Sequence, residues 1–203
     1  MLGIENFPLF LIAAVLLALT PGPDTLYVLT RSVVRGRREG ALSVAGISCG
    51  LVIHALLAAF GVSAFLATSA TAFSVVKYLG AAYLLYLGVR SLWLTGAKVD
   101  NEAVTPRSSR RTFWQGFMTN VLNPKVALFF LAFLPQFVSP TANAGVAPFL
   151  VLGLIVIAIA ASWLLIVAAL AHQVGKFLQT NRLALERFAG VVYIGLALRL
   201  SRA

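Results

Sequence analysis

The chain has 203 residues, of which 60% are hydrophobic and 11% are charged, and its mean hydropathy is +0.93. A soluble domain has roughly a quarter of its residues charged, so this composition excludes a globular protein surrounded by water and predicts that lipid covers much of the surface. The formal charge of +10 does not indicate nucleic-acid binding, because most basic residues gather in alternate connections between apolar runs.

Apolar runs of spanning length predict six transmembrane helices in a single transporter domain, residues 1–203. In chain order the runs are Phe7–Val34, Ala41–Leu66, Ala70–Leu94, Phe113–Val138, Ala147–Ala171 and Leu183–Leu200. The sixth run is the shortest, because eleven uncharged residues separate Arg187 from Arg199. A re-entrant sixth helix therefore stays open as an alternative to a full span.

The positive charges predict an orientation. Under the positive-inside rule the basic connections are cytoplasmic, and both ends of the chain lie outside if all six segments cross. The alternate connections around residues 67–74 and 139–148 carry no charge. Twelve of the sixteen Lys and Arg residues lie in or beside the basic connections: Arg31, Arg35, Arg37, Arg38, Arg90, Lys98, Arg107, Arg110, Arg111, Lys176, Arg182 and Arg187.

One short pattern occurs twice in the chain. Lys77–Leu84 is similar to Arg187–Ile194, with a base, an aromatic residue, Gly and Tyr at matching positions in the third and sixth segments. Three helices per unit is an odd number, so a second unit would enter the membrane from the opposite side. This predicts an all-α inverted 3+3 repeat, with repeat 1 over residues 1–95, a cytoplasmic linker over 96–112 and repeat 2 over 113–203.

The first and fourth segments are each interrupted near their middle by a proline motif that carries one charge, Asp24 in the first and Lys125 in the fourth. Proline breaks a helix but fits the first turn of a new one, so each motif is expected to restart a helix near mid-membrane. Free N–H groups at such restarts favour a carboxylate. The residues assigned to a substrate site are Thr20, Gly22, Asp24, Asn120, Asn123 and Lys125, and those that break the helices are Pro21, Pro23 and Pro124.

These two motifs predict a site for a zwitterion. The carboxylate would lie near the helix restarts and Lys125, and the amine near Asp24. The alternative is an Asp24–Lys125 ion pair that only locks the two repeats together, because charges inside membranes commonly pair. Asp24 is also a candidate proton carrier.

Three further side chains are pathway candidates. His54 lies on one stripe with Gly46 and Gly50, so it is expected to face the bundle interior, where it would relay protons or simply bond to a neighbouring helix. Tyr83 and Tyr193 occupy matched repeat positions and would line a polar pathway or pack in the core. Trp163, in mid-segment beside Ser162, would line the cavity or pack in the core, and core packing is the favoured interpretation.

The sequence favours no enzyme, metal site or cofactor. It contains no P-loop and no H-E-x-x-H motif, and its single cysteine, Cys49, excludes an internal disulfide. A cation or metal-ion transporter or channel is the alternative function class. Such a protein would use rings of carboxylates or clusters of Cys and His, and few such residues lie in the spans.

With these residues in view, the chain resembles the lysine-exporter (LysE-type) family, in particular its homoserine/threonine exporter branch. The resemblance rests on Thr20–Asp24, Gly116–Lys125, Phe129–Val138 and Tyr78–Arg90, and it extends over essentially the whole chain. It implies a bacterial inner-membrane exporter of homoserine-, threonine- or lysine-like zwitterions, driven by proton antiport. The implied partners are an amino-acid substrate, protons, membrane lipid and a second copy in a homodimer.

Overall fold

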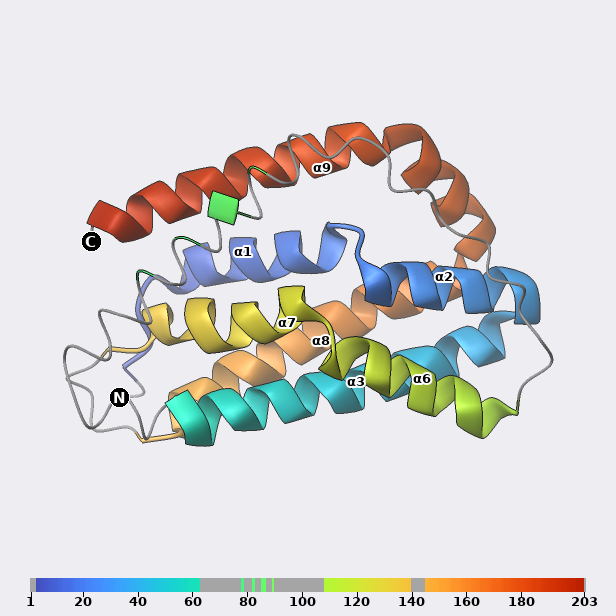
Figure 1. The fold of residues 1–203 in the computed structure, drawn as a ribbon, viewed down its shortest axis with the longest axis horizontal. Coiled ribbons are helices and arrows are strands. Elements are labelled where there is room, and N and C mark those ends of the chain that lie inside the picture. Colours follow the sequence, from blue (N-terminus) through green and yellow to red (C-terminus); the bar gives the residue numbers. More distant parts are fainter. Residues whose placement is uncertain are drawn as a thin grey trace.

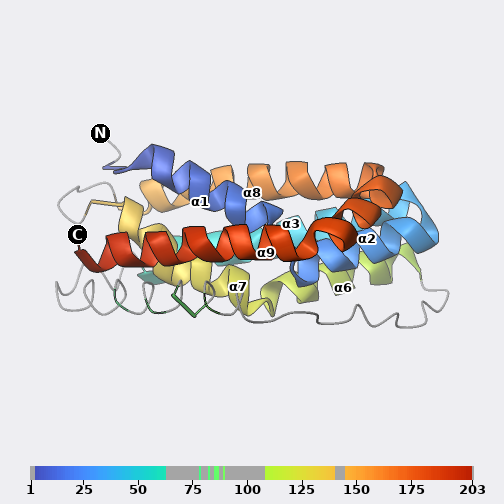
Figure 2. The same cartoon turned by 90° about the horizontal axis from the view of Figure 1, so that it is seen from above.

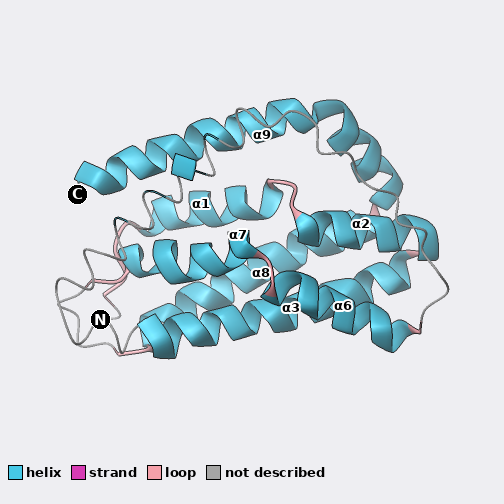
Figure 3. Cartoon of the chain, in the orientation of Figure 1, coloured by secondary structure: helices cyan, strands magenta, loops and turns pink. Residues whose placement is uncertain are grey.

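The computed structural model describes residues 3–62, 108–139 and 145–202, together with the single positions 78, 82, 85, 86 and 89. Across these residues the chain is helical and has no β-strand, apart from an isolated bridge between Ile4 and Val138 (Figure 3). The predicted all-α class is therefore confirmed. The third predicted segment, Ala70–Leu94, lies almost entirely outside the described residues.

The described helices follow the predicted segments in order. The bounds are α1 (Phe7–Leu19), α2 (Pro23–Arg35), α3 (Arg37–Leu56), α6 (Ser109–Val121), α7 (Pro124–Leu128), α8 (Ala147–Ala169) and α9 (Ala171–Arg202). Short helices of other types continue two of them: the π-helix η1 (Leu57–Val62) after α3, and the π-helix η2 (Phe129–Phe133) and the 3₁₀-helix η3 (Leu134–Phe137) after α7.

The first and fourth predicted segments are broken where proline interrupts them. α1 and α2 are bent by 46° across the break, and α6 is bent by 48° relative to the helix that runs from Pro124 to Phe137. Among the described residues, α8 and the helix Arg37–Gly61 are each long and apolar enough to cross a membrane, and counting each bent pair as one span gives four. Figure 1 shows the bent pairs within one elongated bundle.

Helix α3 has the most extensive packing among the described helices, and its main partners are α2, α6 and α8. Its contact with α6 is a backbone contact made at glycines. A Cβ atom added at Gly116 would lie 2.6 Å from the carbonyl oxygen of Ser43, and one added at Gly46 would overlap the carbonyl of Phe113. The stripe of small residues predicted on α3 is thus a helix-packing surface.

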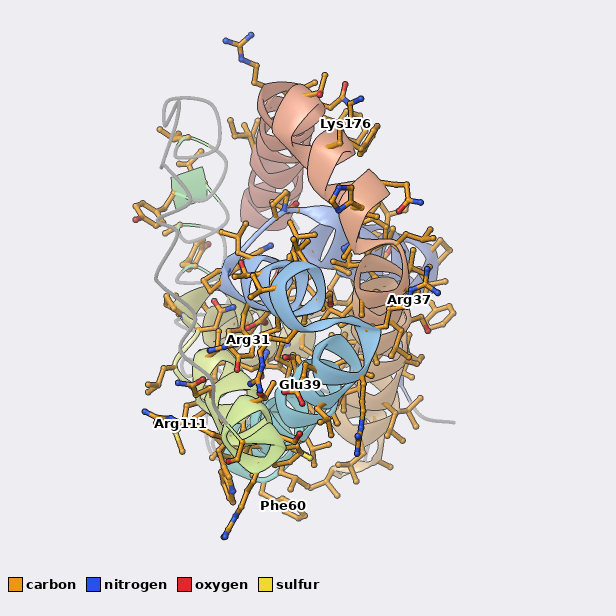
Figure 4. The ribbon with its side chains drawn as sticks, turned by 90° about the vertical axis from the view of Figure 1, so that its right-hand side faces the viewer. Arg31, Arg37, Glu39, Phe60, Arg111 and Lys176 are labelled. Atoms are coloured by element: carbon orange, nitrogen blue, oxygen red, sulfur yellow. The ribbon has the colours of Figure 1, made fainter. Side chains whose placement is uncertain are left out.

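Most of the described basic residues gather at one end of the bundle, whereas Arg199 and Arg202 lie on the last turns of α9. The end of α2 and the beginnings of α3, α6 and α9 meet there, while the first described residues and the end of α9 lie at the opposite end (Figures 1 and 2). Figure 4 looks onto the basic end, with Arg37, Arg111 and Lys176 at its periphery. This grouping matches the charge pattern from which the orientation was predicted.

A buried carboxylate ties the helices together at the basic end. Glu39, in the first turn of α3, accepts hydrogen bonds of 2.6 Å from the hydroxyls of Ser109 and Thr112 on α6, and it lies 3.7 Å from the guanidinium of Arg35. Arg31 of α2 donates to the side chain of Gln115 at 2.9 Å. These contacts join α2, α3 and α6 at the basic end of the bundle.

Two predicted boundaries are wrong. The fifth connection was expected to be a loop up to Leu183, but α9 already begins at Ala171. Good helix formers such as Ala171, Gln173 and Lys176 lie in its first turns, no proline interrupts them, and the side chains of Thr180 and Asn181 bond back to carbonyls four residues earlier. Helix α6 similarly begins at Ser109, inside the linker predicted over 96–112. Hydropathy locates apolar runs, whereas helices continue into polar sequence.

Candidate functional site

The two helix breaks lie against each other in the structure, and each sends its charged side chain to the other break. Both breaks are visible in Figure 3 as short loops, one between α1 and α2 and one between α6 and α7. Asp24 of the first break reaches Asn120 and Asn123, and Lys125 of the second reaches Leu17 and Thr20. The expectation that the two motifs share one location is met by these contacts.

The local sequence explains both restarts. Pro23 is the first residue of α2, after Gly22 in extended conformation with φ of −148°. Pro124 is the first residue of α7, and the Asn123 side chain caps that helix by accepting a 3.1 Å hydrogen bond from the backbone N–H of Lys125. Proline at the first helical position costs no hydrogen bond, since that N–H has no partner within the helix.

Asp24 is held by two asparagine amides. Its Oδ2 accepts hydrogen bonds from Asn120 Nδ2 at 2.8 Å and from Asn123 Nδ2 at 3.2 Å. Asn120 is fully buried and Asn123 is nearly so. The other carboxylate oxygen of Asp24, Oδ1, is buried without a hydrogen-bond partner. One oxygen is therefore committed to the opposite break and the second remains available as an acceptor.

Lys125 binds the carbonyl end of α1. Its Nζ donates hydrogen bonds of 2.9 Å to the backbone oxygens of Leu17 and of Thr20. Gly22 lies beside this side chain, because a Cβ atom added there would be 3.9 Å from Nζ. A cation is favourable at this place, since the last carbonyls of a helix carry negative partial charge and have no partner within the helix.

The predicted alternative of a locking ion pair is not what the side chains form. Asp24 and Lys125 both point into the junction of the breaks, but Asp24 bonds to amides and Lys125 to main-chain carbonyls. Among the described residues the recorded ion pair joins Arg35 and Glu39 instead. The two helix breaks are thus joined by polar contacts that leave both charges without an ionic partner at bonding distance.

His54 supports the second break from α3. Its Nε2 lies 3.2 Å from the backbone oxygen of Asn120, and its ring stacks on Phe130 with centroids 6.0 Å apart. The side chain is buried and its Nδ1 has no hydrogen-bond partner. This contact is the bond to a neighbouring helix, which the sequence analysis gave as one of two roles for His54. Asn120 contacts both His54 and Asp24, so it bridges the two side chains.

A small cavity lies at the junction of the breaks. Its volume is about 40 Å³, which holds about three water molecules. Its polar wall contains Thr20, Asp24, Thr25, Asn123, Lys125 and Trp163. Apart from Gly22, the rest of the wall is aliphatic. Its residues come from α1, α3, α7 and α8: Ala14, Leu17, Ala18, Ile47, Leu51, Val126, Val156, Ala160 and Leu164.

Sequence reasoning underestimated one residue of this wall. Trp163 was expected to pack in the core, but it lines the cavity, and its indole N–H is buried without a hydrogen-bond partner. Its position beside Ser162 in the middle of an apolar run was the available signal. The backbone oxygens of Leu17 and Thr20 could not be found from residue types, because any residue carries that group.

The remaining predicted residues divide into two groups. Thr20, Gly22, Asp24, Asn123 and Lys125 line the cavity, and Asn120 contacts it through Asp24. Tyr83 and the side chain of Tyr193 lie outside the described residues. Among those described, no three His, Cys, Asp or Glu side chains come together as a metal site would require.

Comparison with known proteins places the chain in a family. Residues 15–203 match the model of the LysE type translocator family. The leucine efflux protein of Salmonella typhimurium (strain LT2) is 32% identical over 206 residues, covering 98% of this chain and 96% of that protein. The homoserine/homoserine lactone efflux protein of Salmonella typhi is 34% identical over 151 residues, covering 74% and 72%.

A third relative, the uncharacterized membrane protein YrhP of Bacillus subtilis (strain 168), is 28% identical over 197 residues, covering 92% of this chain and 93% of that protein. No solved structure gives a significant match. Since the family model spans nearly the whole chain, both helix breaks included, the protein belongs to the LysE family of membrane translocators.

Proposed function

We propose that the protein exports neutral aliphatic amino acids and that the junction of the two helix breaks is the substrate site. The observation that carries this proposal is the cavity in which Asp24 and Lys125 meet without forming an ion pair. A zwitterion needs one acceptor and one donor of opposite charge at close range. Relatives whose names describe leucine efflux and homoserine efflux agree with a substrate of this kind.

The polar groups divide between the two ends of an amino acid. The substrate ammonium binds Asp24 Oδ1, the carboxylate oxygen that has no partner in the structure. The substrate carboxylate binds the remaining proton of the Lys125 ammonium, two of whose three protons are used by Leu17 and Thr20. The unpaired indole N–H of Trp163 is a second donor for the same carboxylate.

The apolar wall favours an aliphatic side chain. Leu17, Ile47, Leu51 and Val156 contribute to it, and apolar walls stabilise apolar groups in proportion to the area removed from water. Among the described lining residues Asp24 is the only carboxylate, so a second ammonium on a lysine side chain would have no partner. The cavity is small, so its walls must separate before a whole amino acid enters.

Proton antiport follows from competition for one oxygen. A proton on Asp24 and a substrate ammonium require the same acceptor, so binding one excludes the other. If the site opens outward with bound substrate and returns inward with a bound proton, the protein exchanges substrate for protons across the membrane. His54 and Lys125 are the other titratable groups at this junction, and His54 reaches Asp24 through Asn120. His54 is the candidate relay for that proton.

The membrane arrangement proposed is the inverted 3+3 repeat in the bacterial inner membrane, with the basic end of the bundle in the cytoplasm and both chain ends outside. Two bent pairs with similar angles, 46° and 48°, support the repeat. The gathering of basic residues at the end opposite the chain ends supports the orientation (Figures 1 and 4).

Efflux from proteoliposomes tests this function. Vesicles containing the purified protein are loaded with labelled leucine, lysine or glutamate, and efflux is followed with and without a pH gradient. The proposal expects leucine efflux that is accelerated when the receiving side is acidic. Efflux of none of the three amino acids, or an equal rate for all three, would contradict it.

A further inference from the structure

We propose that the ammonium group of Lys125 is a built-in substitute for a bound metal cation. It occupies the place at the end of a broken helix where other transporters bind a metal cation, so that this protein works without sodium. The inference rests on the proposed transport function for its meaning, since a requirement for sodium matters only in a transporter. Its geometric basis is independent of which amino acid is carried.

The oxygen atoms around Lys125 Nζ are of the kind that bind alkali cations. In transporters with broken helices, unwound carbonyls and the C-terminal ends of half-helices coordinate sodium. Here the carbonyl oxygens of Leu17 and Thr20, at the C-terminal end of α1, both lie 2.9 Å from Nζ. The side chain crosses from the second break to reach them, so the cation belongs to one bent pair and its ligands to the other.

The carbonyl end of α1 gives a structural reason for a cation at this place. The last carbonyls of α1 end inside the bundle, where Leu17 is buried. Unpaired carbonyls in such surroundings are costly, and a cation satisfies several of them at once. Asp24, on α2, is the nearby carboxylate, yet it bonds to Asn120 and Asn123 and leaves Lys125 to the carbonyls.

The carbonyl end of α6 at the second break is satisfied differently. The Asn120 oxygen accepts a 2.9 Å hydrogen bond from the backbone N–H of Asn123, and His54 Nε2 lies 3.2 Å from the same oxygen. A nitrogen side chain from another helix therefore contacts the carbonyl end of each half-helix, but of these two ends only the α1 end relies on a cation. The lysine caps the end beside the cavity, where its charge also faces the substrate site.

Thermal unfolding of three purified proteins tests the inference. The proteins are the wild type, Lys125→Ala and the control Lys176→Ala, which removes an exposed lysine on α9. Each is measured in choline chloride, sodium chloride, n-propylammonium chloride and n-propanol. Propylammonium replaces the atoms that the Ala substitution removes, and propanol has nearly the same shape without the charge.

In choline, Lys125→Ala is expected to melt about 4–8 °C below the wild type, because two charge-assisted hydrogen bonds are lost. Propylammonium should recover most of that difference in melting temperature, and propanol should not. The wild type and Lys176→Ala should each melt at the same temperature in sodium chloride as in choline chloride. A Lys125→Ala protein that gains no more from propylammonium than from propanol overturns the inference. So does a wild type that is stabilised by sodium relative to choline.

A second measurement covers the case in which Lys125→Ala does not fold. Leucine efflux by the wild type is compared in sodium and in choline on both sides of the vesicle membrane. Equal rates support a built-in cation, and loss of efflux in choline overturns it. If the wild type transports no amino acid under any condition, the proposed function fails, while the unfolding data still decide whether the α1 end is a cation site.

Discussion

The buried amide of Asn120 donates a 2.8 Å hydrogen bond to the carboxylate of Asp24, although the two residues belong to different broken helices. The bond joins the end of α6 to the first turn of α2 and orients one carboxylate oxygen. The other oxygen remains without a partner. One contact therefore connects the two broken helices and leaves free the oxygen that we propose as the acceptor for the substrate ammonium.

Replacing Asn120 by Ala should lower both stability and transport. The substitution removes one of the two amides on Asp24 and leaves a buried carboxylate less satisfied, which costs about 1–3 kcal/mol. Thermal unfolding and leucine efflux measure the two effects. Asn181→Ala is the matched control, because that amide bonds within its own helix at an exposed position. Equal effects of the two substitutions would argue against a special role for Asn120.

Asp24→Asn keeps the shape of the side chain and removes its charge. The protein should fold, since Asn can still accept a hydrogen bond from a neighbouring amide. Leucine efflux should fall about tenfold or more, because the charge-assisted bond to the ammonium is lost, and the remaining efflux should no longer respond to a pH gradient. Glu5→Gln, at an exposed position, serves as the control. Retained acceleration by the gradient would show that the proton is carried elsewhere.

Trp163→Phe tests the indole N–H of the cavity wall. The substitution keeps an aromatic ring and deletes a buried donor that has no partner in the structure. The half-saturating concentration for leucine should rise about tenfold or more, as for the loss of one hydrogen bond to a charged group, with little change in stability. Trp114→Phe, whose side chain is 48% exposed, is the control. If Trp163→Phe leaves substrate affinity unchanged, the carboxylate does not bind there.

Gly46→Leu should destabilise the protein through the contact between α3 and α6. A side chain at Gly46 would overlap the carbonyl of Phe113, and overpacking of this kind typically costs about 1–3 kcal/mol. Gly61→Leu is the control, since nothing lies within 4 Å of a Cβ atom added at Gly61. The fraction of monodisperse protein after detergent extraction and its Tm report the difference. A normal Tm for Gly46→Leu would mean that the two helices can separate at no cost.

Much of the architecture could be predicted from the sequence because its signals are local. Hydropathy located the helices, and Pro23 and Pro124 located the restarts, since a proline ring excludes a continuous helix whatever surrounds it. The stripe of Gly46 and Gly50 indicated the face of α3 that packs. These features depend on residue type and spacing alone.

The arrangement of bonds inside the site could not be predicted in the same way. Opposite charges left an ion pair between Asp24 and Lys125 open as an alternative, but the partners of Lys125 are main-chain oxygens of Leu17 and Thr20, which residue types do not reveal. The early start of α9 was missed for a related reason, because its first turns are polar while helix formation depends on backbone bonding.

Direct binding of leucine and of two analogues tests the central claim, which is that the junction of the breaks binds both ends of an amino acid. The analogues are leucinamide, which lacks the carboxylate, and 4-methylpentanoate, which lacks the amine. The wild type should bind leucine about tenfold or more tightly than either analogue, and Asp24→Asn should bind leucine and 4-methylpentanoate with nearly equal affinity. A wild type that binds 4-methylpentanoate as tightly as leucine, or an Asp24→Asn protein that still discriminates fully between them, would contradict the account.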